Sequence, residues 1–207
     1  MNYLELAQMA PSNRGHIVAY QDLGLYVNKK NALYRSTYLY PEEIKELSTK
    51  YKSVKTYAGN FSIDKVIIDI DKGDDSDESV FNFLKGVLFE LEELDVKRTS
   101  MQVYFSGSGF HIAITNEVFC FTSSPKLPFI VKATIAKILP SVDLSIYART
   151  GIYRVAHTKN QKTGLYKIPI TLNEAKNFSI KDIHALATEP RFEYPYQLLD
   201  GDGELEE

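Results

Sequence analysis

One short run, residues 65–71, constrains the fold of this 207-residue chain most strongly. It reads Lys-Val-Ile-Ile-Asp-Ile-Asp. Because side chains alternate between the two faces of a strand, Asp69 and Asp71 share one face and the apolar residues next to them take the other. Neighbouring carboxylates repel each other, and a divalent cation with a preference for oxygen ligands would offset that repulsion. The run therefore predicts a strand that ends at a magnesium or manganese site; a solvated acidic loop is the alternative.

Residues after this run predict a mixed chain of strands and helices. Asp75 followed by Glu78 is typical of a helix start, and apolar residues then recur at helical spacing to about Asp95. Residues 101–106 and 110–115 alternate as strands, and the small residues between them predict a tight turn. The order is thus strand, long helix and hairpin.

The remaining elements are predicted from shorter patterns. A proline and two acids at 41–43 predict the start of a helix that runs to about residue 51. Further predictions are strands at 16–20, 23–27, 142–147, 152–157 and 165–171, a helix from about 128 to 139, and partly helical structure over 173–187. The C-terminal end is acidic, so we expect 191–207 to be a tail or linker.

Composition narrows the class of protein. The chain is 44% hydrophobic and 25% charged, which is ordinary for a globular protein with a real core. Cys120 is the only cysteine, which excludes an intramolecular disulfide and a cysteine-based zinc site. No secretion signal is evident and no apolar run reaches the roughly 18 to 20 residues of a membrane span, so we expect a cytoplasmic protein without membrane contact. The formal net charge of -3 means that any polyanion site is built locally.

A second segment suits phosphate binding. The turn Ser106-Gly107-Ser108-Gly109 is followed closely by His111. Glycines allow backbone and hydroxyl donors to approach phosphate oxygens, and a histidine on the adjoining strand can donate to the same oxygens. The structural alternative is a plain hairpin turn followed by a packed histidine.

A third segment, 142–154, adds another carboxylate and two arginines. Asp143 would complete a set of three acids for two metal ions. Arg154 and, further on, Lys167 are suited to clamp a triphosphate. The alternative is a solvated basic hairpin. We expect three other basic residues to be ordinary surface side chains: Arg35, Lys159 and Lys162.

Taken together, these segments resemble a known family. Asp69-Ile70-Asp71, Ser106-Gly107-Ser108-Gly109-Phe110-His111 and Val142-Asp143, followed by basic residues, look like the three motifs of the archaeo-eukaryotic primase superfamily, also called primase-polymerases. The resemblance covers roughly residues 60–171. The chain lacks the zinc element of many cellular members, which favours the phage, plasmid or standalone type.

The resemblance implies roles for individual residues. Asp69, Asp71 and Asp143 match the carboxylates that bind two Mg²⁺ or Mn²⁺ ions, and His111 matches a catalytic histidine that contacts the phosphates of the incoming nucleoside triphosphate. The nucleotide-binding residues would be Ser106, Ser108, His111, Arg149, Arg154 and Lys167.

The resemblance also implies a fold. It is a recognition-motif-like antiparallel sheet with flanking helices, packed on an N-terminal α/β unit, with the active cleft between them. The catalytic domain would span residues 1–190, with an N-terminal unit at about 1–60 and a core at about 61–190, followed by the acidic segment 191–207.

The implied activity is template-directed nucleotidyl transfer, in which a DNA primase makes and extends primers on single-stranded DNA. A replicative helicase, on another chain or beyond residue 207, would be a partner. Alternatives are an end-joining or gap-filling polymerase of the same fold, a non-catalytic nucleic-acid-binding module and a metal-dependent phosphodiesterase. The choice between ribonucleotides and deoxyribonucleotides, the template sequence and the oligomeric state stay open.

Overall fold

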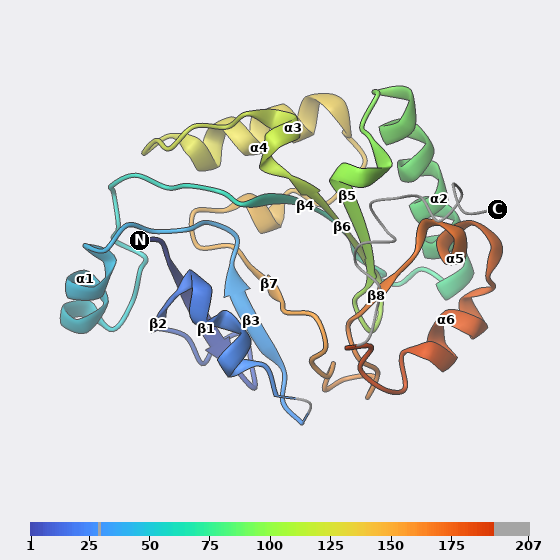
Figure 1. The fold of residues 1–207 in the computed structure, drawn as a ribbon, viewed down its shortest axis with the longest axis horizontal. Helices are drawn as coiled ribbons and strands as arrows, with labels where there is room; N and C mark the ends of the chain where they lie inside the picture. The colour runs from blue at the N-terminus through green and yellow to red at the C-terminus, as the bar shows by residue number, and fades with distance from the viewer. Residues whose placement is uncertain (29, 193–207) are drawn as a thin grey trace.

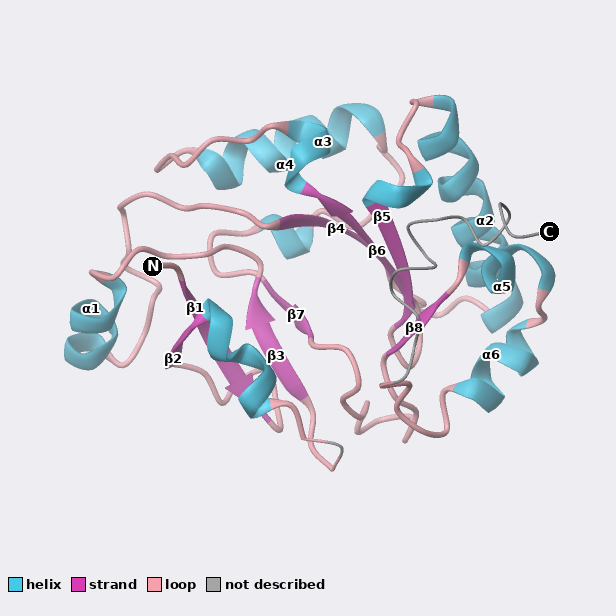
Figure 2. Ribbon diagram, in the orientation of Figure 1, coloured by secondary structure: helices cyan, strands magenta, loops and turns pink. Residues whose placement is uncertain are grey.

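The structure is a computed structural model that describes residues 1–28 and 30–192. These residues form an α+β fold, as the sequence predicts (Figure 2). The strands are β1 (Tyr3–Gln8), β2 (His16–Ala19), β3 (Leu33–Ser36), β4 (Lys65–Ile70), β5 (Met101–Phe105), β6 (Phe110–Thr115), β7 (Ile152–Arg154) and β8 (Ile168–Ile170). The helices are α1 (Ile44–Tyr51), α2 (Asp77–Glu93), α3 (Asn116–Phe119), α4 (Leu127–Ile138), α5 (Leu172–Asn177) and α6 (Ile180–Leu186), with 3-10 helices η1 (Tyr20–Tyr26), η2 (Arg98–Ser100) and η3 (Ser145–Tyr147). Residues 193–207 of the predicted tail lie outside the described residues.

The strands form two antiparallel four-stranded sheets. The first has the order β2-β1-β3-β7 and the second has the order β4-β6-β5-β8. Figure 1 shows the first sheet beside the second. Strand β7 comes late in the chain, yet it pairs with β3, so a later strand completes the sheet of the N-terminal unit. We call the first sheet with its helices the first lobe and the second sheet with its helices the second lobe. The chain therefore crosses between the two lobes more than once.

The second sheet buries one face against helices. Figure 1 shows α2, α5 and α6 on the side of this sheet that faces away from the first sheet. From β4, Val66, Ile68 and Ile70 are at most 2% exposed. The buried stripe of α2 repeats at helical spacing and comprises Val80, Phe81, Leu84, Val87, Leu88 and Leu91. Each fully buried side chain of this size contributes about 1.5–3 kcal/mol, so the packing of α2 stabilises this face of the sheet.

The start of α2 differs from the prediction by one capping residue. Ser76, not Asp75, is the N-cap, and its hydroxyl oxygen accepts a hydrogen bond of 3.1 Å from the backbone amide of Ser79. Asp77 and Glu78 then lie in the first turn, where the helix dipole favours negative charge. Among the described helices, none is long and apolar enough to cross a membrane.

Two predicted strands are wrong. Residues 23–27 fall mostly within the 3-10 helix η1, and the alternation there reflects no buried face, because Leu25 is 84% exposed. Residues 142–147 contain a single bridge, between Asp143 and Asp69, and then form η3. The side chain of Asp143 bonds to Ser145 and bends the backbone into a turn, which stops the strand from continuing.

Candidate metal and phosphate site

Three carboxylates meet at the end of β4. Asp69 is the second-last residue of the strand and Asp71 is the first residue after it. Asp143 lies beside them because its backbone amide donates to the carbonyl of Asp69 at 3.4 Å, the isolated bridge between these two segments. Each of the three residues has a carboxylate oxygen within 4.8 Å of the others. The structure thus brings together the three acids that the sequence predicts, from segments more than seventy residues apart.

The carboxylate of Asp143 is held in place by its own turn. One of its oxygens accepts from the backbone amide of Ser145 at 2.8 Å, and the other accepts from the Ser145 hydroxyl at 2.6 Å. Each oxygen retains further lone pairs for another ligand. Asp143 is therefore oriented before any cation binds.

The electrostatics of the acids favour a cation. Burial raises the pKa of Asp71, and the charges of Asp69 and Asp143 raise it further. Burial acts in the same direction on Asp69, but the close approach of His111 and the charge of Lys167 hold its pKa below the usual range. Asp69 Oδ1 is buried, and within the described residues its nearest donor, His111 Nε2, is 3.3 Å away without hydrogen-bond geometry. Three hard oxygen ligands and an unsatisfied buried oxygen fit Mg²⁺ or Mn²⁺.

His111 stands directly across from Asp69 in the β4–β6 pairing. Its Nδ1 lies 2.7 Å from the ammonium nitrogen of Lys167, and its Nε2 points to Asp69. Lys167 also donates to the carbonyl of Arg154 at 2.8 Å. Because an ammonium can only donate, Nδ1 is assigned as the acceptor and the imidazole proton is placed on Nε2. Burial, followed by the charge of Lys167, lowers the pKa of His111. The ring is therefore a neutral donor directed at the acids.

Lys167 occupies a position different from that of a phosphate clamp. It is 2% exposed, and its ammonium lies 4.8 Å from the ring centre of Tyr104 and 5.2 Å from that of Tyr153. Burial lowers its pKa well below the usual value. It is not among the residues that line the cavity next to the acids. The structure thus places Lys167 behind His111, where it orients the imidazole.

Two of the acids, Asp69 and Asp71, border a cavity of about 220 Å³. Arg154 lines it with its guanidinium 5.0 Å from the ring centre of Tyr34, and one of its nitrogens donates to the carbonyl of Lys159 at 2.9 Å. Several donors remain on the guanidinium for a phosphate. Among the described residues, the lining comprises Pro11, Tyr34, Asp69, Asp71, Ser106, Ser108, His111, Ile152, Tyr153, Arg154 and Asn160.

The glycines of the β5–β6 turn pack closely against Asn160 and against the end of β4. Gly107 has φ +97°, and a Cβ there would lie 2.6 Å from Cβ of Asn160. A Cβ on Gly109 would lie 2.2 Å from the carbonyl oxygen of Ile70. The hydroxyl of Ser106 accepts from the Gly109 amide at 3.1 Å and so braces the turn, whereas the partly exposed Ser108 is open to the cavity.

Arg149, a predicted nucleotide-binding residue, lies elsewhere. Its guanidinium donates to the carbonyl of Tyr57 and sits 5.4 Å from the ring centre of Phe61. It is not among the residues lining the cavity. These contacts are structural, because they tie the loop before β7 to the aromatic cluster of the first lobe.

Sequence reasoning missed several residues of the cavity. Tyr34 and Tyr153 come from strands of the first sheet, whose proximity to β6 depends on how the sheets pack. Asn160 is buried against the glycine turn. Lys162 is exposed, as expected, yet its charge acts on Asp71, where it partly opposes the rise in pKa caused by burial and by the other two acids. The only visible signal was that Asn160 stands in a polar turn. That signal does not indicate a cavity, because asparagine is common in turns for purely local reasons.

Arg35 is not the surface side chain that we expected. It is 3% exposed and donates from its two terminal nitrogens to the two oxygens of Asp64, at 2.9 and 2.8 Å. Arg35 belongs to β3 and Asp64 precedes β4, so this bidentate pair joins the two sheets.

In the comparisons with known proteins, no family model matches this sequence and no curated protein matches it.

Proposed function

We propose that this chain is a template-directed nucleotidyltransferase that makes primers on single-stranded DNA and extends them, a DNA primase of the primase-polymerase type. One observation carries the proposal. Asp69 and Asp71 line a cavity that His111 and Arg154 also border, and Asp143 has a carboxylate oxygen within 4.8 Å of theirs. Acids for divalent cations beside donors for phosphate are what transfer of a nucleotide requires.

Some residues at the cavity would bind the triphosphate, and others would position those that bind it. Arg154 binds the triphosphate through its free guanidinium donors, and Ser108 adds a hydroxyl donor from the turn. His111 donates from Nε2 to a phosphate oxygen, and Lys167 keeps its tautomer and orientation. The three acids would hold Mg²⁺ or Mn²⁺, which when bound offset the negative charge that gathers on the phosphates during in-line displacement.

The reaction joins two nucleotides and releases pyrophosphate. The 3'-hydroxyl of the initiating nucleotide or primer forms a bond to the α-phosphorus of the next nucleoside triphosphate. The bond from that phosphorus to the bridging oxygen of pyrophosphate breaks, and the proton of the hydroxyl passes to solvent. Single-stranded DNA supplies the template, and a replicative helicase is the partner that would deliver it.

The proposal includes a finer description of the fold. The second sheet with α2 and α4 would be the recognition-motif-like core, and the first sheet would be the N-terminal unit that covers the cleft. The described tertiary contacts support this, because Tyr153 of β7 packs edge-on to His111 of β6, with ring centres 6.2 Å apart. The nucleotide would then lie between the two sheets.

The direct test is synthesis on circular single-stranded DNA with labelled nucleotides and Mg²⁺ or Mn²⁺. Wild type is compared with an Asp69→Asn/Asp71→Asn variant and with Lys132→Met, a change on the exposed surface of α4. We expect short products from wild type and Lys132→Met, and none from the double variant. Separate reactions with ribonucleotides and deoxyribonucleotides show the sugar preference.

Other outcomes discriminate the alternatives. Extension of a supplied primer without de novo synthesis would favour an end-joining or gap-filling polymerase. Shortening of a labelled single strand in Mn²⁺ would favour a phosphodiesterase. Binding of single-stranded DNA without any reaction would favour a non-catalytic module, and each of these results would contradict the priming activity.

A further inference from the structure

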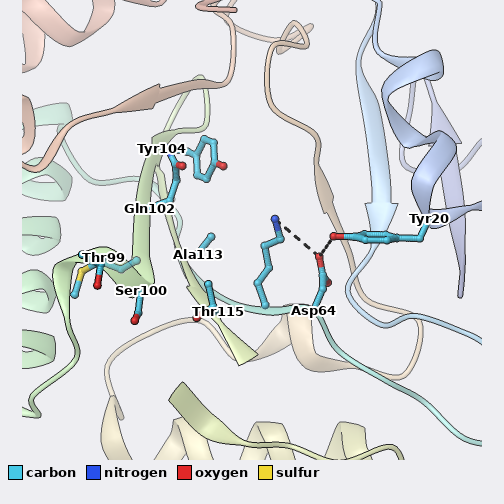
Figure 3. A pocket seen from close by; sticks show the side chains of 10 residues that line it. Tyr20, Asp64, Thr99, Ser100, Gln102, Tyr104, Ala113 and Thr115 are labelled. Carbon is cyan, nitrogen blue, oxygen red and sulfur yellow. Dashed lines mark hydrogen bonds and ion pairs between the residues drawn. The ribbon is translucent and has the colours of Figure 1, made fainter. Parts of the chain in front are cut away.

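A second, larger hollow opens between the sheets, away from the three acids. Its volume is about 300 Å³, which is within the range of small-ligand pockets. Figure 3 shows Tyr20 and Asp64 on one side of it and Gln102 and Tyr104 on the other. Its lining comprises Tyr20, Asp64, Lys65, Thr99, Ser100, Met101, Gln102, Tyr104, Ala113 and Thr115.

The strand register places this hollow on the same sheet face as the acids. Asp69 pairs with His111, whereas four residues earlier Lys65 pairs with Thr115. Strands rise about 3.3 Å per residue, so Lys65 lies about 13 Å from Asp69 along β4. A buried layer separates the two cavities, since Lys167 contacts His111 on one side and the ring of Tyr104 on the other. The hollow is therefore a separate cavity.

Its polar groups include donors with unused capacity. Gln102 Nε2 is buried and has no hydrogen-bond partner among the described residues. The ammonium of Lys65 lies 3.9 Å from Asp64, but Arg35 already neutralises that carboxylate through two hydrogen bonds. The local balance of Arg35, Lys65 and Asp64 is one net positive charge. An anion with additional acceptor oxygens would satisfy these donors.

The rest of the lining suits a planar group. Ala113 forms part of the floor, where its small side chain leaves room next to Gln102, its partner across β5 and β6. The aromatic rings of Tyr20 and Tyr104 come from opposite lobes and flank this floor (Figure 3). Aromatic rings bind nucleic-acid bases by stacking, and the donors of Gln102 can bond a base edge.

We propose that this hollow binds one nucleotide unit of single-stranded nucleic acid, with its phosphate at Lys65 and its base beside Gln102 and Tyr104. The need for an anionic, acceptor-rich ligand follows from the cavity alone, while the choice of a nucleotide rests on the proposed function. Binding there needs no metal ion, because the three acids lie outside this cavity.

The test measures binding of fluorescein-labelled octathymidylate in EDTA, where no polymerisation takes place. Lys65→Met and Gln102→Leu should each weaken binding about tenfold, because each removes a donor that the ligand uses. Lys132→Met removes the same charge from the exposed face of α4 and should bind like wild type.

A second measurement locates the strand without any variant. Octathymidylate that carries 5-iodouracil is irradiated with wild type, and mass spectrometry identifies the crosslinked peptide. We expect the peptide that contains Tyr104 or the one that contains Tyr20. Crosslinking only elsewhere, or wild-type affinity in folded Lys65→Met and Gln102→Leu, would overturn the assignment.

Competition with thymidine monophosphate separates a strand from a free nucleotide. We expect the monophosphate to displace the octamer only at far higher concentration; displacement at equal concentration would overturn the assignment to a strand. If the synthesis assay fails while binding still depends on Lys65, the proposed function is wrong and this site stands. If synthesis succeeds and binding does not depend on Lys65, the proposed function stands and this site is wrong.

Discussion

At the scale of single residues, the site depends on a buried pair of basic side chains. Lys167 and His111 are 2% and 6% exposed, and their nitrogens lie 2.7 Å apart. A buried ammonium is unfavourable unless it has partners, and here these are the imidazole, the Arg154 carbonyl and two tyrosine rings. The pair therefore exists to fix the direction of the Nε2 donor, not to add charge at the surface.

Replacement of Lys167 by methionine tests this role. Methionine has a similar length, so we expect the fold to persist, as far-UV circular dichroism would show. Because His111 loses the partner that fixes its tautomer, kcat for nucleotide incorporation should fall about 10- to 100-fold, with a smaller change in KM. Lys132→Met is the control. A raised KM with unchanged kcat would instead indicate that Lys167 binds the triphosphate.

Replacement of Asp71 by asparagine tests the mutual repulsion of the acids. In EDTA the variant should unfold at a higher temperature than wild type, because one of three neighbouring negative charges is removed. Addition of Mn²⁺ should stabilise wild type, by about 2.7 kcal/mol at a hundred times the Kd, and the variant much less. Thermal unfolding with and without Mn²⁺ measures both effects. Equal stabilisation of the two proteins would exclude Asp71 from the metal site.

At the scale of elements, the β5–β6 turn and the end of β4 position one another. The Gly109 backbone approaches the Ile70 carbonyl so closely that no side chain fits between them. Ile70 lies between Asp69 and Asp71, so any shift of this carbonyl moves the acids. The glycine of the turn is thus required for the geometry of a strand that is remote in sequence.

The variant Gly109→Ala should therefore lose stability and metal binding together. Its Cβ would lie 2.2 Å from a backbone oxygen, which cannot rotate away. We expect a loss of at least about 2 kcal/mol in the free energy of unfolding and a weaker thermal shift with Mn²⁺. The matched control is Gly86→Ala. Gly86 lies in the middle of α2 on its exposed face, with open space around it, so this variant should gain up to about 1 kcal/mol in the free energy of unfolding. Urea unfolding compares the two, and a neutral Gly109→Ala would show that β4 adapts.

At the scale of the whole molecule, the two sheets are joined through a buried ion pair. The guanidinium of Arg35 lies between the rings of Tyr20 and Tyr153, at 5.5 and 5.3 Å from their centres, and binds Asp64 with both terminal nitrogens. Burial alone would raise the pKa of Asp64, but the charge and hydrogen bonds of Arg35 outweigh it, so the pKa is lowered. This pair fixes the separation of the sheets and hence the width of both cavities.

The lowered pKa predicts how stability depends on pH. The unfolded chain binds the proton of Asp64 near the ordinary value of about 3.9, whereas the folded chain binds it only at lower pH. The stabilisation is therefore complete above that value and is lost as the pH falls toward the folded pKa. Asp64→Asn should lower the free energy of unfolding by about 3 kcal/mol at pH 7, and the two curves should converge in acid.

Urea unfolding of both proteins from pH 7 to pH 2 measures this dependence. Glu42→Gln is the control, because Glu42 pairs with Lys45 on the exposed surface and its loss should leave stability nearly unchanged. Parallel curves for wild type and Asp64→Asn over the whole range would show that the pair does not supply the expected pH-dependent stability.

What the sequence determined by itself is the local pattern. Alternation in 65–71 predicted β4 and the shared face of Asp69 and Asp71, and helical spacing predicted α2, because both depend only on neighbouring residues. The motif resemblance pointed to His111 and Asp143, which the structure places beside those acids. Phosphate binding at this site stays a prediction.

Only the tertiary structure decided the surroundings of that pattern. The sequence does not show whether an arginine, a lysine or a tyrosine is solvated or enclosed between two sheets. Arg35 and Lys167 are buried, and Arg149 is turned away from the cavity, because β7 returns to the first sheet and brings that sheet against the second. The physical reason is that burial and pairing are set by which distant segments pack together, and alternation along a strand carries no information about its partner across a cleft.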